Sequence, residues 1–225
     1  MKTVTDVKST FKNSELFDQA LTHRSWVNEN PAQRGTNERL EFLGDAILEF
    51  VVSSFIYTAF PSEEEGFLTA LRANIVNTKS LAALATRLSV GEYLFLSKGE
   101  EQGGGRNNPS LLADTIEAII GALYIDQGFD ASKEFIQVNL LERIDEFLEK
   151  PLKDPKSRLQ ELVQSKGMEA PRYKLVREEG PDHSKEFVIE VFVGEKSLGE
   201  GLGRSKSAAE QSAAEHALET FAEIE

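Results

Sequence analysis

The sequence predicts two folded domains: an all-α N-terminal domain and a C-terminal α+β domain with the element order α-β-β-β-α. Up to about residue 150, apolar residues recur at helical spacing and runs of β-branched residues are scarce. Residues 151–155 contain two prolines and charged neighbours, which do not continue a helix. Beyond them, three short segments alternate like strands between two helical segments. We therefore expect domains at 1–150 and 156–225, joined by a linker at 151–155.

Helices in the first domain are expected near 14–22, 38–59, 66–88, 109–126 and 130–149. Pro61, Gly91, Gly128 and the glycine-rich loop at 103–109 separate these segments. In the second domain we expect a helix at 157–166, strands at 172–177, 185–193 and 196–201, and a long alanine-rich helix at 206–221.

Composition excludes several classes of protein. The net charge of -13 argues against a generally basic protein that coats nucleic acid, so any contact with a polyanion must be local. The absence of cysteine excludes disulfides, thiolate metal sites and cysteine nucleophiles, and it fits a reducing compartment. Because residues 1–24 lack a continuous apolar run, we expect no signal peptide, no membrane span and a cytoplasmic location.

Two of the expected helices each carry an acidic face. At about 100° per residue, Glu38, Glu41 and Asp45 lie on one side of the helix at 38–59. Asp114 and Glu117 share one side of the helix at 109–126. The opposite sides are apolar, with Leu40, Leu43, Ile47 and Phe50 on the first helix and Leu112, Ile116, Ile119 and Leu123 on the second. If the apolar sides pack together, the carboxylates can meet.

Two interpretations of these acids remain open. They can form an ordinary solvated face, or they can bind a hard divalent cation such as Mg²⁺, which prefers oxygen ligands. The segment from Leu40 to Leu71 contains no Lys or Arg that would pair with the acids locally, which favours a metal site. No His or Cys accompanies them, as zinc would require.

Three further residues stand out near the acids. Gly44 and Gly121 lie in mid-helix, where glycine costs about 1 kcal/mol relative to alanine and usually indicates close backbone approach. Phe42 projects beside the carboxylates, outside the apolar stripe. It can pack under a neighbouring helix or contact a second subunit, and the sequence leaves both open.

Residues 37–45 resemble the signature of the ribonuclease III family, reading NERLEFLGD. Three further stretches agree: LTHRS at 21–25, EG at 65–66 and LADTIEAIIG at 112–121. The resemblance implies that Glu41, Asp45, Asp114 and Glu117 bind the catalytic Mg²⁺, for which Mn²⁺ is the expected substitute. It ties Asp45 and Glu117 most closely to the chemistry. Glu38 and Glu65 match acids that shape the cleft and engage RNA.

The same resemblance implies an activity. It is the endonucleolytic hydrolysis of double-stranded RNA to 5′-phosphate and 3′-hydroxyl ends with short 3′ overhangs. It implies a homodimer in which Phe42 inserts into the partner, and no small-molecule cofactor. The expected substrates are ribosomal RNA precursors and, behind them, messenger and other structured transcripts.

The C-terminal segment resembles a double-stranded-RNA-binding domain, which recognises A-form shape rather than sequence. The resemblance implies that Gln160 and His183 touch the two minor grooves, and that Lys206 at its helix start faces phosphates, beside Arg204. This chain departs from the family because Ser207, Ala208 and Ala209 follow Lys206, where basic residues usually cluster. Acidic residues also outnumber basic ones in the segment, so we expect modest affinity per domain.

Two other classes of protein could share some of these features. A protein that binds structured RNA without cutting it has the same fold, but the complete set of carboxylates favours the enzyme. A carboxylate di-iron bundle needs Glu-x-x-His pairs, and none of the three histidines follows a Glu at that spacing.

Overall fold

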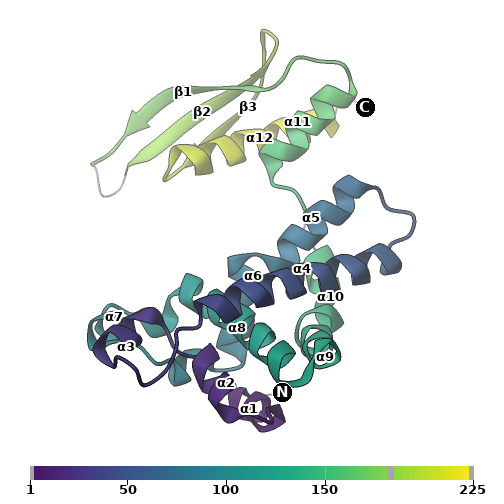
Figure 1. The fold of residues 1–225 in the computed structure, drawn as a ribbon. Coiled ribbons are helices and arrows are strands. Elements are labelled where there is room, and N and C mark those ends of the chain that lie inside the picture. Colours follow the sequence, from purple (N-terminus) through teal and green to yellow (C-terminus); the bar gives the residue numbers. More distant parts are fainter. Residues whose placement is uncertain (1–2, 150, 182–184, 223–225) are drawn as a thin grey trace. The chain divides into compact units, whose positions relative to one another are not determined.

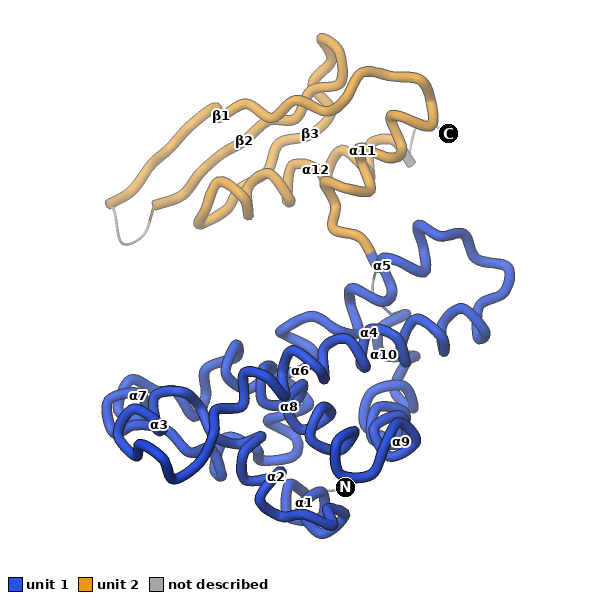
Figure 2. Tube along the Cα trace, in the orientation of Figure 1, with its two compact units in different colours: residues 1–152 blue, residues 153–225 orange. Residues whose placement is uncertain are grey.

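A computed structural model of the chain describes residues 3–149, 151–181 and 185–222. The chain forms two compact units, residues 1–152 and 153–225, which are coloured separately in Figure 2. The division falls after Leu152, inside the segment expected to be a linker. Each unit has its own apolar core. The predicted fold class, an all-α unit followed by an α+β unit, is confirmed.

Unit 1 is built of helices around two long central ones, α4 and α8 (Figure 1). Its elements are α1 (Val4–Thr10), α2 (Ser14–Ala20), α3 (Arg24–Glu29), α4 (Glu38–Ala59), α5 (Glu65–Val76), α6 (Thr78–Arg87), η1 (Val90–Tyr93), α7 (Lys98–Gln102), η2 (Gly105–Asn107), α8 (Pro109–Gln127), α9 (Phe129–Asn139), η3 (Leu141–Arg143) and α10 (Ile144–Leu148).

Two expected helices are divided in the structure. The segment predicted as one helix at 66–88 breaks at Asn77, whose backbone is extended and whose side chain accepts the Ser80 N–H as the cap of α6. The segment predicted at 130–149 consists of α9, η3 and α10. The short helices α1, α3 and α7 were not predicted, because lengths of seven, six and five residues are too short to show a clear apolar period.

Helices α4 and α8 cross where each carries a glycine. A Cβ atom built on Gly44 would lie 1.8 Å from the Glu117 carbonyl oxygen, and one built on Gly121 would lie 2.1 Å from the Leu40 carbonyl oxygen. No other side chain fits between two backbones at this distance. The close approach that the two glycines predicted is therefore confirmed.

The apolar residues predicted to face the core are all buried on α8 but not on α4. Leu112, Ile116, Ile119 and Leu123 are all buried, and so are Leu40 and Ile47. Phe50 was wrongly placed in the core: it is 61% exposed and meets Phe129 of α9 edge to face, with 5.8 Å between ring centroids. Its position leaves it beyond the edge of the stripe that faces α8.

Helix α4 also has the length and mean hydropathy of a membrane-crossing helix. This is weak evidence for a span, because a core helix has the same composition. In the structure its apolar residues Leu48, Val51, Val52 and Ile56 are buried in the core of unit 1. The α4 sequence is therefore explained by packing within this unit.

Unit 2 packs two helices on an antiparallel three-stranded sheet of order β1-β2-β3. Its elements are α11 (Pro155–Ser165), β1 (Arg172–Glu179), β2 (Glu186–Val193), β3 (Lys196–Gly203) and α12 (Lys206–Ala222). Alternate glycines of β3 lie against the backbone of α12; a Cβ on Gly201 would be 2.1 Å from the Ala213 nitrogen. The small alanine side chains of α12 thus allow this helix to pack closely on the sheet.

Replacing Gly44 with alanine tests the helix crossing. The new methyl group must push α4 away from α8, and overpacking of this kind costs about 1–3 kcal/mol. Because the new Cβ would overlap a backbone oxygen at 1.8 Å, we expect a cost at the upper end of this range, above the gain of about 1 kcal/mol in helix propensity. We expect a lower free energy of unfolding, measured by urea denaturation. Gly99→Ala is the matched control, because a Cβ there has no atom within 4 Å, and it should be neutral or slightly stabilising.

Candidate metal centre and nucleic-acid interface

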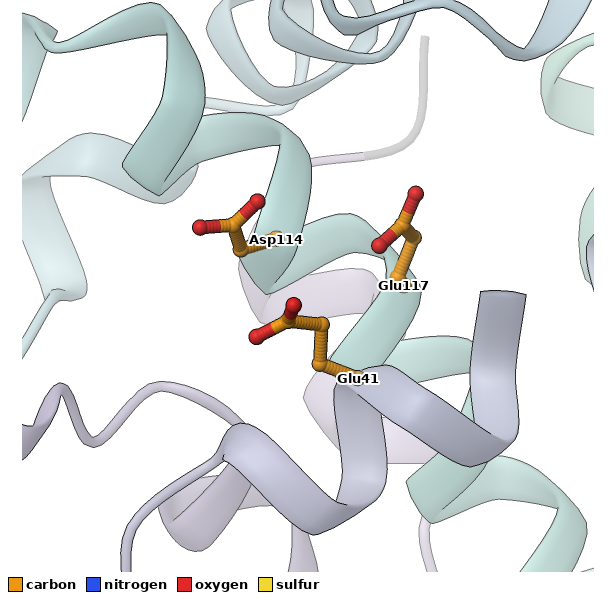
Figure 3. Close-up of side chains that lie close together, drawn as sticks. All are labelled: Glu41, Asp114 and Glu117. Carbon is orange, nitrogen blue, oxygen red and sulfur yellow. The ribbon is translucent and has the colours of Figure 1, made fainter.

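The crossing of α4 and α8 brings three carboxylates together. Glu41 lies one turn before Gly44 on α4, and Asp114 and Glu117 lie two turns and one turn before Gly121 on α8. One oxygen from each of Glu41, Asp114 and Glu117 lies within 4.8 Å of the other two. Figure 3 shows the three side chains extending from the two helices toward a common space. We call these three residues the carboxylate cluster.

Burial and mutual repulsion raise the pKa of every member of the cluster. The pKa of Glu117 rises to about 8, first because the side chain is desolvated and then because Asp45, Asp114 and Glu41 are negative. Desolvation followed by the charge of Asp114 raises the pKa of Glu41. The pKa of Asp114 is raised by desolvation, although His23 opposes the shift. The fold therefore holds three carboxylates close together although no Lys or Arg among the described residues forms a salt bridge with them.

The donor set fits a hard divalent cation. All three ligand groups are carboxylates, and within the described part of the chain neither they nor Asp45 form a salt bridge with Lys or Arg. Mg²⁺ is bound in proteins through one or two carboxylates together with water, which such a cluster can supply. A bound cation would also remove the repulsion that raises these pKa values.

Asp45 belongs to the same acidic face but not to the group of three. It is exposed one turn after Glu41, and its charge raises the pKa of both Glu41 and Glu117. Glu49, a further turn along α4, also raises the pKa of Glu117 and is paired with Arg72 at 3.1 Å. The sequence prediction missed Glu49, although its spacing of four residues from Asp45 indicates the same face.

Glu38 and Glu65 lie at opposite ends of α4. Glu38 opens the helix, accepts a hydrogen bond from Thr36 and faces Arg24 at 3.8 Å. Glu65 opens α5, beyond the far end of α4. Because α4 has 22 residues and a helix rises about 1.5 Å per residue, these two acids are separated by about 30 Å along it. Within one chain, the structure does not bring Glu65 to the carboxylate cluster.

Backbone hydrogen bonds join the segment from Leu21 to Ser25 to Phe95 and to the start of α4. The Phe95 N–H donates to the Leu21 carbonyl at 2.9 Å, and the His23 N–H donates to the Phe95 carbonyl at 3.1 Å. The Asn37 N–H donates to the Thr22 carbonyl at 2.9 Å, which fixes the start of α4. Sequence reasoning assigned no role to His23 or Asn37, because this pairing joins segments far apart in the chain.

A cavity of about 400 Å³ opens beside the cluster. Its polar lining includes His23, Arg24 and Asn37 as well as Glu41 and Asp114 of the cluster. Apolar contacts come from Leu94, Leu96 and Leu111. The cavity therefore combines the acids with two basic side chains and an amide.

In unit 2, the predicted RNA-binding residues that the structure describes are all exposed. Gln160 lies on α11, Arg204 follows β3, and Lys206 opens α12. Lys206 lies over the ring of Phe187, with its Nζ 5.9 Å from the ring centroid. His183 lies outside the described residues. Exposure at a helix start leaves Lys206 available to a phosphate.

Comparison with known proteins decides the family. Residues 13–144, more than half of the chain, match the family described as Ribonuclease-III-like, and residues 155–220 match the double-stranded RNA binding motif. The chain belongs to the ribonuclease III family. It is therefore an endoribonuclease, and this family cleaves double-stranded RNA. The fold and the enzyme class implied by residues 37–45 are confirmed, and the binding-only alternative is not favoured.

Individual relatives support the assignment. Ribonuclease 3 of Geobacillus kaustophilus is 51% identical over 213 residues, which are 94% of this chain and 87% of the relative. Ribonuclease 3 of Halalkalibacterium halodurans is 49% identical over 215 residues, 95% of this chain and 82% of the relative. A solved nuclease domain of ribonuclease III from Campylobacter jejuni has a TM-score of 0.56 and 37% identity, covering 67% of this chain and 99% of that domain.

The raised pKa of Glu117 predicts how the stability of this ribonuclease III family member depends on pH. The folded protein binds the Glu117 proton more tightly than the unfolded chain does. The stabilising contribution is therefore complete below the unfolded pKa of about 4.5 and is lost as pH rises through about 8. Without divalent cations, Glu117→Gln should lose less stability over this range than the unaltered protein, measured by urea denaturation in EDTA. Glu142→Gln, at an exposed glutamate of η3, is the control for net charge, and an identical profile for both variants contradicts the prediction.

Proposed function

We propose that the carboxylate cluster binds Mg²⁺ and that the enzyme hydrolyses phosphodiester bonds of double-stranded RNA there. The observation that carries the proposal is the convergence of Glu41, Asp114 and Glu117 within 4.8 Å, without a basic partner. Mg²⁺ favours oxygen ligands, and Mn²⁺ shares this preference. Bound at the cluster, the metal would lower the pKa of a water and neutralise charge on the phosphate oxygens.

The protein groups have distinct tasks in this proposal. Glu41, Asp114 and Glu117 would hold the cation, together with Asp45, which the family resemblance also assigns to the metal and which lies one turn from Glu41 on the same acidic face. Asp45 and Glu117 are the acids closest to the chemistry, as the family resemblance implies. Hydrolysis with cleavage of the bond to the 3′ oxygen leaves 5′-phosphate and 3′-hydroxyl ends. Glu38 would engage RNA at the mouth of the site, where it is exposed.

A homodimer completes the proposal. Phe42 is 81% exposed on α4, which is unusual for a large aromatic and fits burial against a second copy. One of the Campylobacter jejuni structures concerns a region involved in dimer formation of that nuclease domain, at 40% identity and a TM-score of 0.53, covering 59% of this chain and 95% of that one. Two clusters, each cutting one strand, would give staggered cuts with short 3′ overhangs. Any role for Glu65 at a cluster would require the partner copy, because Glu65 lies far from the cluster of its own chain.

Unit 2 supplies affinity for the duplex in this proposal. Gln160, Arg204, Lys206 and, by resemblance, His183 contact the minor grooves and phosphates. Two such units in a dimer would bind one duplex together, which compensates for the few basic residues in each. We propose processing of ribosomal RNA precursors and other structured transcripts in the cytoplasm as the biological role.

Removing the metal tests the reaction. In EDTA, cleavage of a labelled RNA duplex should stop, because the cluster alone repels the phosphates. Glu117→Gln should bind the duplex with near-normal affinity and cut it at least about a hundredfold more slowly, measured by gel shift and single-turnover cleavage. Glu142→Gln should cut normally. Rapid cleavage by Glu117→Gln, or by the unaltered protein in EDTA, refutes the assignment of the site.

Phe42→Glu tests the dimer. A charge placed at the centre of an apolar contact should convert the protein to monomers, detected by analytical ultracentrifugation, and should reduce cleavage of both strands. Tyr93→Glu places the same charge on another exposed aromatic residue, on η1, and should remain dimeric. Full activity and unchanged sedimentation of Phe42→Glu would exclude this role.

A further inference from the structure

The cavity beside the carboxylate cluster is lined by an asparagine whose side-chain amide has no hydrogen-bond partner among the described residues. Asn37 is 4% exposed and lines the cavity. Its backbone is fully used, since the N–H donates to Thr22 and the carbonyl accepts from Leu40 and Glu41. Its side chain makes no cap to α4 and no hydrogen bond with any residue that the structure describes. The amide is not among the solvent-inaccessible polar atoms without a partner, so it is open to the cavity and can donate to a ligand there.

His23 presents a second free donor to the same cavity. Its Nδ1 accepts the Ser25 N–H at 3.3 Å and lies 2.8 Å from the Ser25 Oγ, which in turn accepts the Ser97 N–H at 3.0 Å. Because Nδ1 is an acceptor, the neutral ring carries its proton on Nε2. Within the described part of the chain, Nε2 has no hydrogen-bond partner.

The group of mutually close ligand atoms consists of Glu41, Asp114 and Glu117 and does not include the His23 ring. His23 nevertheless lines the same cavity as Glu41 and Asp114. Its free N–H is therefore available to a group that occupies this cavity. Arg24, which lines the same cavity, adds a positive charge at its mouth.

We propose that this cavity binds the sugar–phosphate of the nucleotide next to the cleaved bond, with the Asn37 amide and the His23 Nε2–H as its hydrogen-bond donors. The inference rests on the proposed function, because that function places the cleaved phosphate at the adjoining cluster. The neighbouring nucleotide is covalently attached and must lie beside it. Phosphate and ribose oxygens accept hydrogen bonds from both donors, and Leu94, Leu96 and Leu111 provide apolar contact for the sugar carbons.

The two donors can be removed without removing their structural contacts. His23→Asn keeps an oxygen that caps α3 as Nδ1 does, but it loses the donor at the Nε2 position. Asn37→Ala removes an amide that holds nothing in the protein, so the thermal midpoint should not fall. Each change should weaken binding of an RNA duplex to a Glu117→Gln background by about tenfold to a hundredfold, the contribution of one hydrogen bond to a charged oxygen.

The controls separate substrate contact from structure. His216→Asn removes the same donor from a histidine in unit 2 whose Nδ1 accepts the Glu200 N–H, and it should bind and cut normally. Stabilisation by Mg²⁺, followed as the shift in thermal midpoint, should remain unchanged in His23→Asn and Asn37→Ala. A duplex with 2′-deoxy nucleotides at the cleavage site distinguishes the two acceptors. If Asn37→Ala still weakens its binding, the amide contacts a phosphate oxygen, and if the loss disappears, it contacts the ribose hydroxyl.

Two results overturn the inference. One is binding and cleavage within about twofold of the parent protein in both variants, which is less than one hydrogen bond contributes. The other is a fall in thermal midpoint together with a smaller Mg²⁺-induced shift, which would show a structural role. Failure of the proposed function has a different signature: the unaltered enzyme does not cut with Mg²⁺, while the loss of RNA binding in the two variants persists.

Discussion

The contact between Gly44 and Gly121 is the constraint on which the site depends. With no side chain at either position, the backbones of α4 and α8 approach until a Cβ would overlap a carbonyl oxygen of the other helix. Glu41 on one helix and Asp114 and Glu117 on the other then lie close enough for their oxygens to share an ion. A larger separation of the helices would leave three ordinary solvated acids. The cost of glycine in two helix interiors, about 1 kcal/mol each, is thus offset by packing and used for function.

The same geometry places negative charges where they repel one another. Burial and the neighbouring acids raise the pKa of Glu117 to about 8, so the site without metal is partly protonated at neutral pH. The core beneath α4 and α8 has to supply the stability that this repulsion removes, and fully buried Leu48, Ile116 and Ile120 are part of that core. Ionisable groups with strongly shifted pKa values are common in catalytic sites.

The sequence predicted the parts of this arrangement that depend on local pattern. Helical spacing placed α4 and α8 nearly to the residue, and the cost of glycine in mid-helix predicted their close approach. It failed for Phe50, because a stripe seen in the sequence does not show which edge of it the neighbouring helix covers. Sequence reasoning assigned no role to Asn37 or His23 for a different reason. Each has a hydrogen-bonding group without a partner among the described residues, and this can be recognised only from the positions of all the segments around the cavity.

The charge of the protein connects metal and substrate. A chain with a net charge of -13 repels RNA on average, and the cavity beside the cluster has only His23 and Arg24 as basic lining residues. A divalent cation at the cluster would therefore be a large part of the local attraction for phosphate. Because binding free energies are coupled reciprocally, RNA in the site must then raise the affinity for the metal by the same factor as the metal raises the affinity for RNA. On this argument, the substrate and the metal would each increase the affinity of the acids of α4 and α8 for the other.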